Sequence, residues 1–130
     1  MSRILVVDDD AMIRAALAEM LGRKGHEVVL AQNGTEALAR QMEQPAEIML
    51  TDIFMPGMEG LETIKRIRKM FPAVKIVAMT GRVTPDPGVD FLKVAQMLGA
   101  RQTLRKPFTT AQLVAALAQI SIMTPEDGVG

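Results

Sequence analysis

Short apolar runs alternate with stretches of helical periodicity along this chain, and the alternation limits what it can fold into. Four runs rich in branched residues are typical of strands buried on both faces of a parallel sheet: 4–7, 28–30, 48–50 and 74–79. A weaker strand is predicted over 102–104. Apolar residues at helical spacing predict five helices, around 13–21, 35–42, 61–67, 91–98 and 113–120. Five strand–helix pairs in 130 residues predict one α/β domain, a parallel sheet with helices on both faces.

The composition excludes several classes of protein. Fifteen Lys and Arg residues balance fifteen Asp and Glu residues, whereas a nucleic-acid-binding domain usually has a basic surplus, so no direct contact with nucleic acid is expected. There is no cysteine, and a single histidine, His26, cannot build a multi-histidine metal site. No apolar stretch reaches the roughly 18 residues of a membrane span, and no signal peptide is visible. We therefore expect a cytoplasmic protein without membrane contact.

Polar side chains follow four of the five predicted strands at the point where each strand ends. They are three consecutive aspartates after the first strand, then Asp52, Thr80 and Lys106. Because the carboxyl ends of parallel strands share one edge of the sheet, where functional sites lie, we expect these side chains to meet there. Of the three aspartates, Asp10 is expected to cap the first helix, which leaves Asp8 and Asp9 for the site.

Clustered carboxylates point to a divalent cation and to phosphoryl chemistry. Close carboxylates repel one another, and Mg²⁺ relieves this by taking several oxygen ligands. With Mg²⁺ present, a carboxylate can attack a phosphoryl group, while Lys106 and the Thr80 hydroxyl stabilise the transferred charge. Taken singly, each residue has a structural explanation: a helix cap, a loop residue, a strand-end hydroxyl or a surface lysine. Their convergence on one edge favours a site.

Four segments resemble the receiver domain of two-component response regulators. They are Ile4–Asp10, with the acidic pair, Leu50–Gly60, with the phosphoacceptor, Ile76–Gly81, with the switch hydroxyl, and Leu104–Phe108, with the lysine. The likeness predicts a receiver domain over residues 1–122 and a C-terminal tail over 123–130. It implies the flavodoxin-like fold, a doubly wound sheet of five parallel strands in the order 2-1-3-4-5 with five helices.

The resemblance also implies a role for each site residue. Asp52 is the phosphoacceptor, Thr80 binds the phosphoryl group and Lys106 pairs with it. The Mg²⁺ ligands implied are Asp8, Asp9, Asp52 and the backbone carbonyl of Phe54. The implied phosphoryl donor is a sensor histidine kinase or a histidine phosphotransfer protein, and the output is contact with a downstream protein. This describes a regulatory phosphoacceptor rather than an enzyme with turnover, and a homodimer is left open.

Two features depart from the family pattern. Thr103 stands three positions before Lys106, where the family usually carries an aromatic residue, so coupling through an inward-turning ring cannot operate in its usual form. The segment between Thr80 and Lys106 is also a few residues longer than usual, with the extra residues expected in Gly81–Gly88. We hypothesise that this loop partly covers Asp52 or forms a docking surface; a tolerated surface insertion is the alternative.

Two further functional interpretations stay open at this stage. One is a pseudo-receiver, an interaction module that is not phosphorylated, which the departures above would suit. The other is a Mg²⁺-dependent phosphohydrolase of the haloacid-dehalogenase type, which needs an Asp-x-Asp-x-Thr motif. Here the aspartates are followed by Ala11 and Met12, so the threonine of that motif is absent. Mg²⁺ affinity and aspartyl-phosphate formation discriminate the three.

Overall fold

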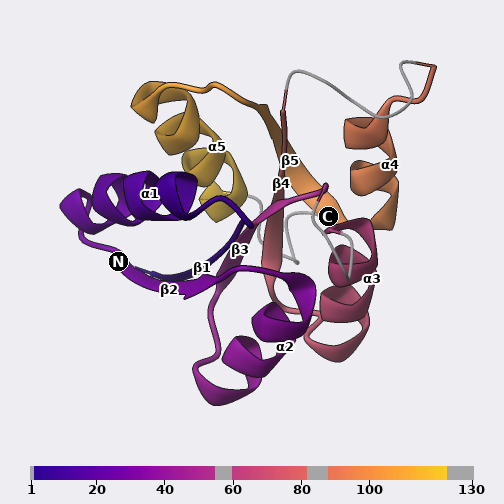
Figure 1. Cartoon of the computed structure of the whole chain (residues 1–130), viewed down its shortest axis with the longest axis horizontal. Coiled ribbons are helices and arrows are strands. Elements are labelled where there is room, and N and C mark those ends of the chain that lie inside the picture. The colour runs from indigo at the N-terminus through magenta and orange to yellow at the C-terminus, as the bar shows by residue number, and fades with distance from the viewer. Residues whose placement is uncertain (1, 55–59, 82–87, 123–130) are drawn as a thin grey trace.

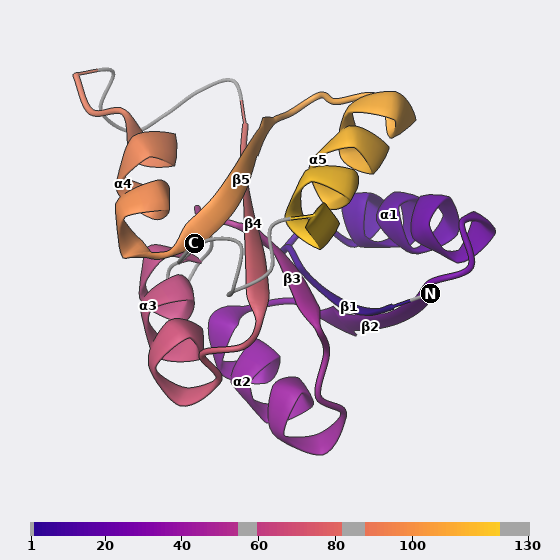
Figure 2. The same ribbon diagram turned by 180° about the vertical axis from the view of Figure 1, so that it is seen from behind.

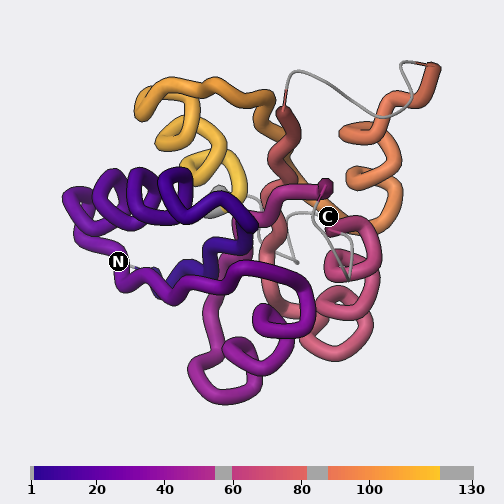
Figure 3. The backbone as a smooth tube through the Cα atoms, in the orientation of Figure 1, coloured from indigo at the N-terminus to yellow at the C-terminus, as the bar shows by residue number. Residues whose placement is uncertain are grey.

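Ten elements alternate strictly between strand and helix in the computed structural model, which describes residues 2–54, 60–81 and 88–122 (Figure 1; Figure 3 traces the backbone). They are β1 (Arg3–Val7), α1 (Ala11–Arg23), β2 (Glu27–Ala31), α2 (Gly34–Glu43), β3 (Ile48–Asp52), α3 (Gly60–Met70), β4 (Lys75–Thr80), α4 (Phe91–Leu98), β5 (Ala100–Arg105) and α5 (Thr110–Ile122). The predicted strands and helices are all present.

The strands form one parallel sheet in the order β2-β1-β3-β4-β5, as the resemblance implied. Helices α1 and α5 cover one face, and α2, α3 and α4 cover the other (Figures 1 and 2). Strand β2 lies on one side of β1, whereas β3, β4 and β5 follow one another on its other side. The direction in which successive strands are added therefore reverses between β1 and β3. In doubly wound sheets this switch point, at the carboxyl ends of the strands, is where ligands bind.

Alternate residues of the strands build two separate cores. Leu5, Met49 and Ile76 pack with Ile64 and Ile67 of α3 on one face. On the other face the neighbouring strand residues pack with the apolar sides of α1 and α5: Ile4, Val6, Leu50, Val77, Leu17, Leu21, Leu113 and Ile120. The central strands are apolar on both faces because both are covered, which is why their sequences are continuous apolar runs.

Two strands extend further than their apolar runs predicted. Asp52 is the last residue of β3 and Thr80 the last residue of β4, whereas both were expected to follow their strands. The sheet's hydrogen bonding continues past the apolar residues: the Ile53 N–H donates to the Met79 carbonyl at 3.0 Å, and the Lys106 N–H donates to the Thr80 carbonyl at 2.7 Å. Both side chains are therefore held on strand backbone rather than on loops.

Side-chain caps define where two helices begin. Asp10 accepts from the Met12 and Ile13 N–H groups, so its predicted role as the cap of α1 is confirmed. Helix α5 is capped by Thr109, the residue directly before it. The Thr109 hydroxyl accepts from the Gln112 N–H at 3.0 Å, and the Gln112 side chain accepts from the Thr109 N–H at 2.8 Å. This reciprocal capping box starts α5 directly after the segment that carries Lys106.

Two predictions fall largely outside the described residues. The central part of the Gly81–Gly88 loop (82–87) is not described, and neither is the tail over 123–130, so the hypotheses about them stay predictions. Among the residues that the structure does describe, no helix is long and apolar enough to cross a membrane.

Candidate functional site

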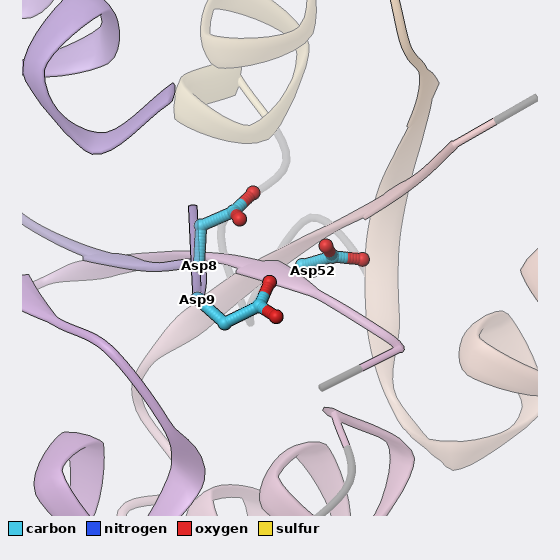
Figure 4. A group of neighbouring side chains, drawn as sticks. All are labelled: Asp8, Asp9 and Asp52. Carbon is cyan, nitrogen blue, oxygen red and sulfur yellow. The ribbon is translucent and has the colours of Figure 1, made fainter. Parts of the chain in front are cut away.

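The carboxyl edge of the sheet collects the side chains that the sequence singled out. Asp8 and Asp9 follow directly on β1, and Asp52 ends the adjacent strand β3 (Figure 4). Thr80 ends β4, and Lys106 follows β5. These residues lie far apart in the sequence but close together in the fold, because parallel strands bring their carboxyl ends to the same edge.

Lys106 is the centre of the site. Its Nζ donates to Asp8 Oδ2 at 2.6 Å and to Asp52 Oδ2 at 2.9 Å. Asp8 and Asp52 are buried, and the Lys106 side chain is 16% exposed. An ammonium held between two carboxylates at these distances makes charge-assisted hydrogen bonds, which are stronger than neutral ones. One cation therefore ties β1, β3 and β5 together at the edge.

Backbone N–H groups orient the other oxygen of each buried carboxylate. The Phe54 N–H donates to Asp52 Oδ1 at 3.1 Å, and the Asp10 N–H donates to Asp8 Oδ1 at 2.9 Å. Each carboxylate oxygen can accept more than one hydrogen bond, so both aspartates keep lone pairs for a further ligand. The predicted use of the Phe54 carbonyl as a metal ligand stays a prediction.

Burial and the contacts with neighbouring groups have opposite effects on the pKa values of Asp52 and Lys106. Burial raises the pKa of Asp52 above its ordinary value, although the hydrogen bonds from Lys106 and Phe54 act in the opposite direction. Burial lowers the pKa of Lys106, but its hydrogen bonds and charge interactions with Asp8 and Asp52 outweigh this and raise it overall. Lys106 therefore stays a cation at neutral pH.

The donor set fits a hard divalent cation. Asp8, Asp9 and Asp52 each offer a carboxylate oxygen, and these oxygens lie within 4.8 Å of one another. Oxygen ligands of this type are those that Mg²⁺ prefers. A second observation concerns the Thr80 hydroxyl, which is buried and has no hydrogen-bond partner among the described residues. Such a group usually has a partner, so an oxyanion beside Thr80 would satisfy it.

Two contacts at the site were not foreseen from the sequence. Arg14 of α1 donates from Nη1 to the Asp8 carbonyl at 2.7 Å. Gly60, the first residue of α3, packs so closely on the Asp52–Ile53 backbone that a Cβ at this position would collide with the Asp52 carbonyl. A signal for Arg14 did exist, because a cation near a helix N-terminus opposes the helix dipole and needs another partner. Gly60 carried no comparable signal.

Thr103, the departure from the family pattern, lies on β5 opposite Ala78. Its side chain is half-buried and shares a sheet face with Thr80, whose strand partner is Arg105. Thr103 borders a surface hollow of about 480 Å³ between α4 and α5. The hollow is lined by Leu92, by residues 102–105, and by Phe108, Gln112, Ala115, Ala116 and Gln119. A small residue therefore stands where a ring would fill space beside the sheet edge.

Comparison with known proteins places this arrangement in a family. The model of the response regulator receiver domain matches residues 4–118. The chain belongs to the response regulator receiver domain family. It is 34% identical over 120 residues to chemotaxis protein CheY of Thermotoga maritima, covering 92% of this chain and 97% of that one. It is 35% identical over 124 residues to response regulator receiver protein CpdR of Brucella abortus, covering 94% of this chain and 98% of that one.

Solved structures of receiver domains agree with the fold. A receiver domain protein from Clostridium thermocellum superposes with a TM-score of 0.82 at 30% identity, covering 92% of this chain and 93% of that chain. Some relatives are longer. The chain is 36% identical over 129 residues to response regulator MprA of Mycolicibacterium vanbaalenii, covering 98% of this chain but 54% of that protein. Receiver domains thus occur both as nearly the whole of a relative and as part of a larger one.

Proposed function

We propose that this receiver domain is a phosphoacceptor switch of a two-component system, with Asp52 as the phosphorylated residue. The observation that carries the proposal is the bridge from Lys106 to Asp8 and Asp52, together with the buried Thr80 hydroxyl, which has no hydrogen-bond partner among the described residues. A structural ion pair has no need of a buried hydroxyl without a partner or of a third carboxylate, Asp9, within reach of both others. A site that receives a phosphoryl group needs all of them.

Asp52, Lys106 and Thr80 each have a separate role in the proposed phosphoryl transfer. A carboxylate oxygen of Asp52 attacks the phosphorus of a phosphohistidine on a histidine kinase or phosphotransfer protein. The O–P bond forms as the P–N bond breaks, and the departing imidazole nitrogen keeps the electron pair. Lys106, already within hydrogen-bond distance of Asp52, stabilises the negative charge on the transferred group. The Thr80 hydroxyl donates a hydrogen bond to a phosphoryl oxygen.

The acidic residues serve a second purpose, which is to hold Mg²⁺. Asp8, Asp9 and Asp52 would supply carboxylate oxygens, and the Phe54 carbonyl is the further ligand that we propose. When bound, the ion neutralises charge on the carboxylates and on the phosphoryl oxygens. Without such a cation, the three carboxylates face one ammonium, and an incoming phosphoryl group would meet a net negative site.

We propose that the output of the switch is contact with a downstream protein. Phosphorylation adds charge next to Thr80, and movement of this residue alters the face formed by α4, β5 and α5. Because Thr103 replaces the usual aromatic residue, a ring that turns inward behind Thr80 takes no part in this transition. The hollow beside Thr103 lies on that face.

Intact mass measurement tests the proposal directly. The protein is incubated with Mg²⁺ and acetyl phosphate, and in parallel with a phosphohistidine donor. We expect a gain of one phosphoryl group per chain, which chelation of Mg²⁺ abolishes. Asp52→Asn should gain none, whereas Glu62→Gln, which changes an exposed carboxylate on α3, should gain one as the wild type does.

The alternatives predict different outcomes. A pseudo-receiver gains no phosphoryl group from either donor, and this result would contradict the proposal. A phosphohydrolase of the aspartyl-nucleophile type would consume many equivalents of donor per chain in steady state. A switch is modified once per chain and returns slowly to its starting mass.

A further inference from the structure

Asp8 is held at four points, and one of them comes from a side chain of α1. Its N–H donates to the Ala31 carbonyl at 3.1 Å, and its two carboxylate oxygens accept from the Asp10 N–H and from Lys106. The fourth contact is on the backbone, where the Asp8 carbonyl accepts from Arg14 Nη1 at 2.7 Å. Every polar group of Asp8 is therefore engaged, and Arg14 holds its carbonyl.

Asp9 is in the opposite situation. Its side chain is exposed, and within the described part of the chain no hydrogen bond or ion pair holds its carboxylate. The carboxylate nevertheless lies within 4.8 Å of those of Asp8 and Asp52 (Figure 4). Its place in the cluster therefore depends on the backbone from which it projects. The Asp8 carbonyl belongs to the peptide plane that joins Asp8 to Asp9, so the bond from Arg14 restrains that plane.

The helix itself gives no reason for a cation at position 14. Arg14 is the fourth residue of α1, close to the positive end of the helix dipole, where cations are disfavoured. Arg14 is half-buried and forms no ion pair with any described carboxylate. Its bond to the Asp8 carbonyl, at the turn between β1 and α1, gives the guanidinium a specific partner.

We propose that Arg14 is a positioning residue for the metal site. By holding the Asp8–Asp9 peptide plane, its guanidinium keeps the otherwise unrestrained Asp9 carboxylate directed at the cation that Asp8 and Asp52 share. The inference rests on the Mg²⁺ site of the proposed function. It adds a residue that lies outside the carboxylate cluster and acts through the backbone rather than on the ion.

The charge of Arg14 and its hydrogen bond have opposite effects on Mg²⁺ binding, and this makes the proposal testable. Its positive charge repels a divalent cation, so removing the charge alone would strengthen Mg²⁺ binding. Its hydrogen bond restrains a ligand, so removing the bond would weaken Mg²⁺ binding. Outer partners of metal ligands commonly change affinity by about 10- to 100-fold when they are removed. We therefore expect the positioning effect to dominate.

Isothermal titration calorimetry with MgCl₂ measures the Kd for Mg²⁺ directly and does not require phosphorylation. For Arg14→Met, which removes both the charge and the donors, we expect a Kd for Mg²⁺ about tenfold higher than that of the wild type. For Arg14→Lys, which keeps the charge and a donor of similar reach, most of the affinity should return. The matched control is Arg23→Met on the same helix. Arg23 is exposed and pairs with Glu19, so its replacement should leave the Kd unchanged.

Phosphorylation kinetics supply a second readout that a general loss of structure would not reproduce. With acetyl phosphate as donor, Arg14→Met should need a higher Mg²⁺ concentration for half-maximal rate, while the rate at saturating Mg²⁺ stays near that of the wild type. Thermal melting without Mg²⁺ checks the fold. If Arg14→Met fails to fold, Arg14→Gln replaces it with the same expected weakening.

The proposal is overturned if Arg14→Met binds Mg²⁺ as tightly as the wild type or more tightly, since the charge would then outweigh any positioning. It is also overturned if the maximal rate falls while the Mg²⁺ requirement stays unchanged. If Asp52 is never phosphorylated but calorimetry gives the expected order of affinities, the switch function fails and the role of Arg14 stands.

Discussion

Asp52 shows how the demands of chemistry and of stability diverge at a single residue. A nucleophilic carboxylate has to be ionised and sheltered from water, but burying an ionised carboxylate costs free energy of folding. Lys106 offsets part of this cost, although it is shared with Asp8. Asp9 adds a third carboxylate within 4.8 Å of these two, while among the described residues the ammonium pairs only with Asp8 and Asp52. The edge of the sheet therefore holds more negative charge than its own cation balances.

The first prediction from this imbalance is that Asp52→Asn stabilises the protein when Mg²⁺ is absent. Burial raises the pKa of Asp52, so the folded state holds this proton more tightly than the unfolded chain does. The ionised form therefore destabilises the fold at pH values above the raised pKa. We expect the variant to gain about 1 kcal/mol in unfolding free energy at pH 7, measured by urea denaturation in EDTA.

The pH dependence gives this prediction its control. As the pH falls below the ordinary value of 3.8, Asp52 is protonated in both states, and the advantage of the variant should disappear. Glu62→Gln, at an exposed carboxylate, should show no comparable gain. A wild type that is more stable than Asp52→Asn at neutral pH would mean that the Lys106 contact outweighs the cost of burial.

At the scale of elements, the sequence predicted what depends on local pattern and left out what depends on packing. The run at 48–50 locates β3 because a strand buried on both faces has to be apolar. The strand continues to Asp52 because its backbone hydrogen-bonds to β4, and apolarity carries no signal for that. Periodicity also says nothing about strand order, which came from the family resemblance. The convergence of Asp8, Asp52 and Lys106 was predictable, since parallel strands end at one edge.

The contact between α3 and β3 could not be foreseen, and it supports a second prediction. Gly60 packs directly on the Asp52–Ile53 peptide, where a Cβ would collide with backbone that cannot easily move. Gly60→Ala should therefore lower the unfolding free energy by about 1–3 kcal/mol, as overpacking does. Because the displaced peptide carries Asp52, the proposed phosphoacceptor, we also expect slower phosphorylation by acetyl phosphate.

Gly22→Ala is the matched control on α1. A Cβ at Gly22 would meet nothing within 4 Å, and the residue lies inside a helix, so alanine should stabilise the protein by up to about 1 kcal/mol. Urea denaturation should thus give opposite signs for the two substitutions. If Gly60→Ala proves neutral, the start of α3 can shift away from β3, and the position of Asp52 does not depend on this contact.

At the scale of the whole molecule, the site links three of the five strands without a covalent bond. Asp8 follows β1, Asp52 ends β3 and Lys106 follows β5, so a ligand that binds their side chains restrains most of the width of the sheet. Lys106 balances only one of the three carboxylate charges, so the carboxylates repel one another more strongly when no metal ion joins it. A bound cation should therefore stabilise the complete fold and not merely its edge.

The last prediction follows by linkage. A ligand that binds only the folded state adds about 1.4 kcal/mol to the unfolding free energy when its concentration is ten times its Kd. MgCl₂ should thus raise the melting temperature above that found in NaCl of equal ionic strength. Asp9→Asn should lose most of this gain, because it removes a carboxylate of the cluster. Asp10→Asn should keep it, because asparagine caps α1 as well as aspartate does and Asp10 lies outside the cluster. Equal Mg²⁺ responses in the two variants would mean that Asp9 does not take part in a Mg²⁺ site with Asp8 and Asp52.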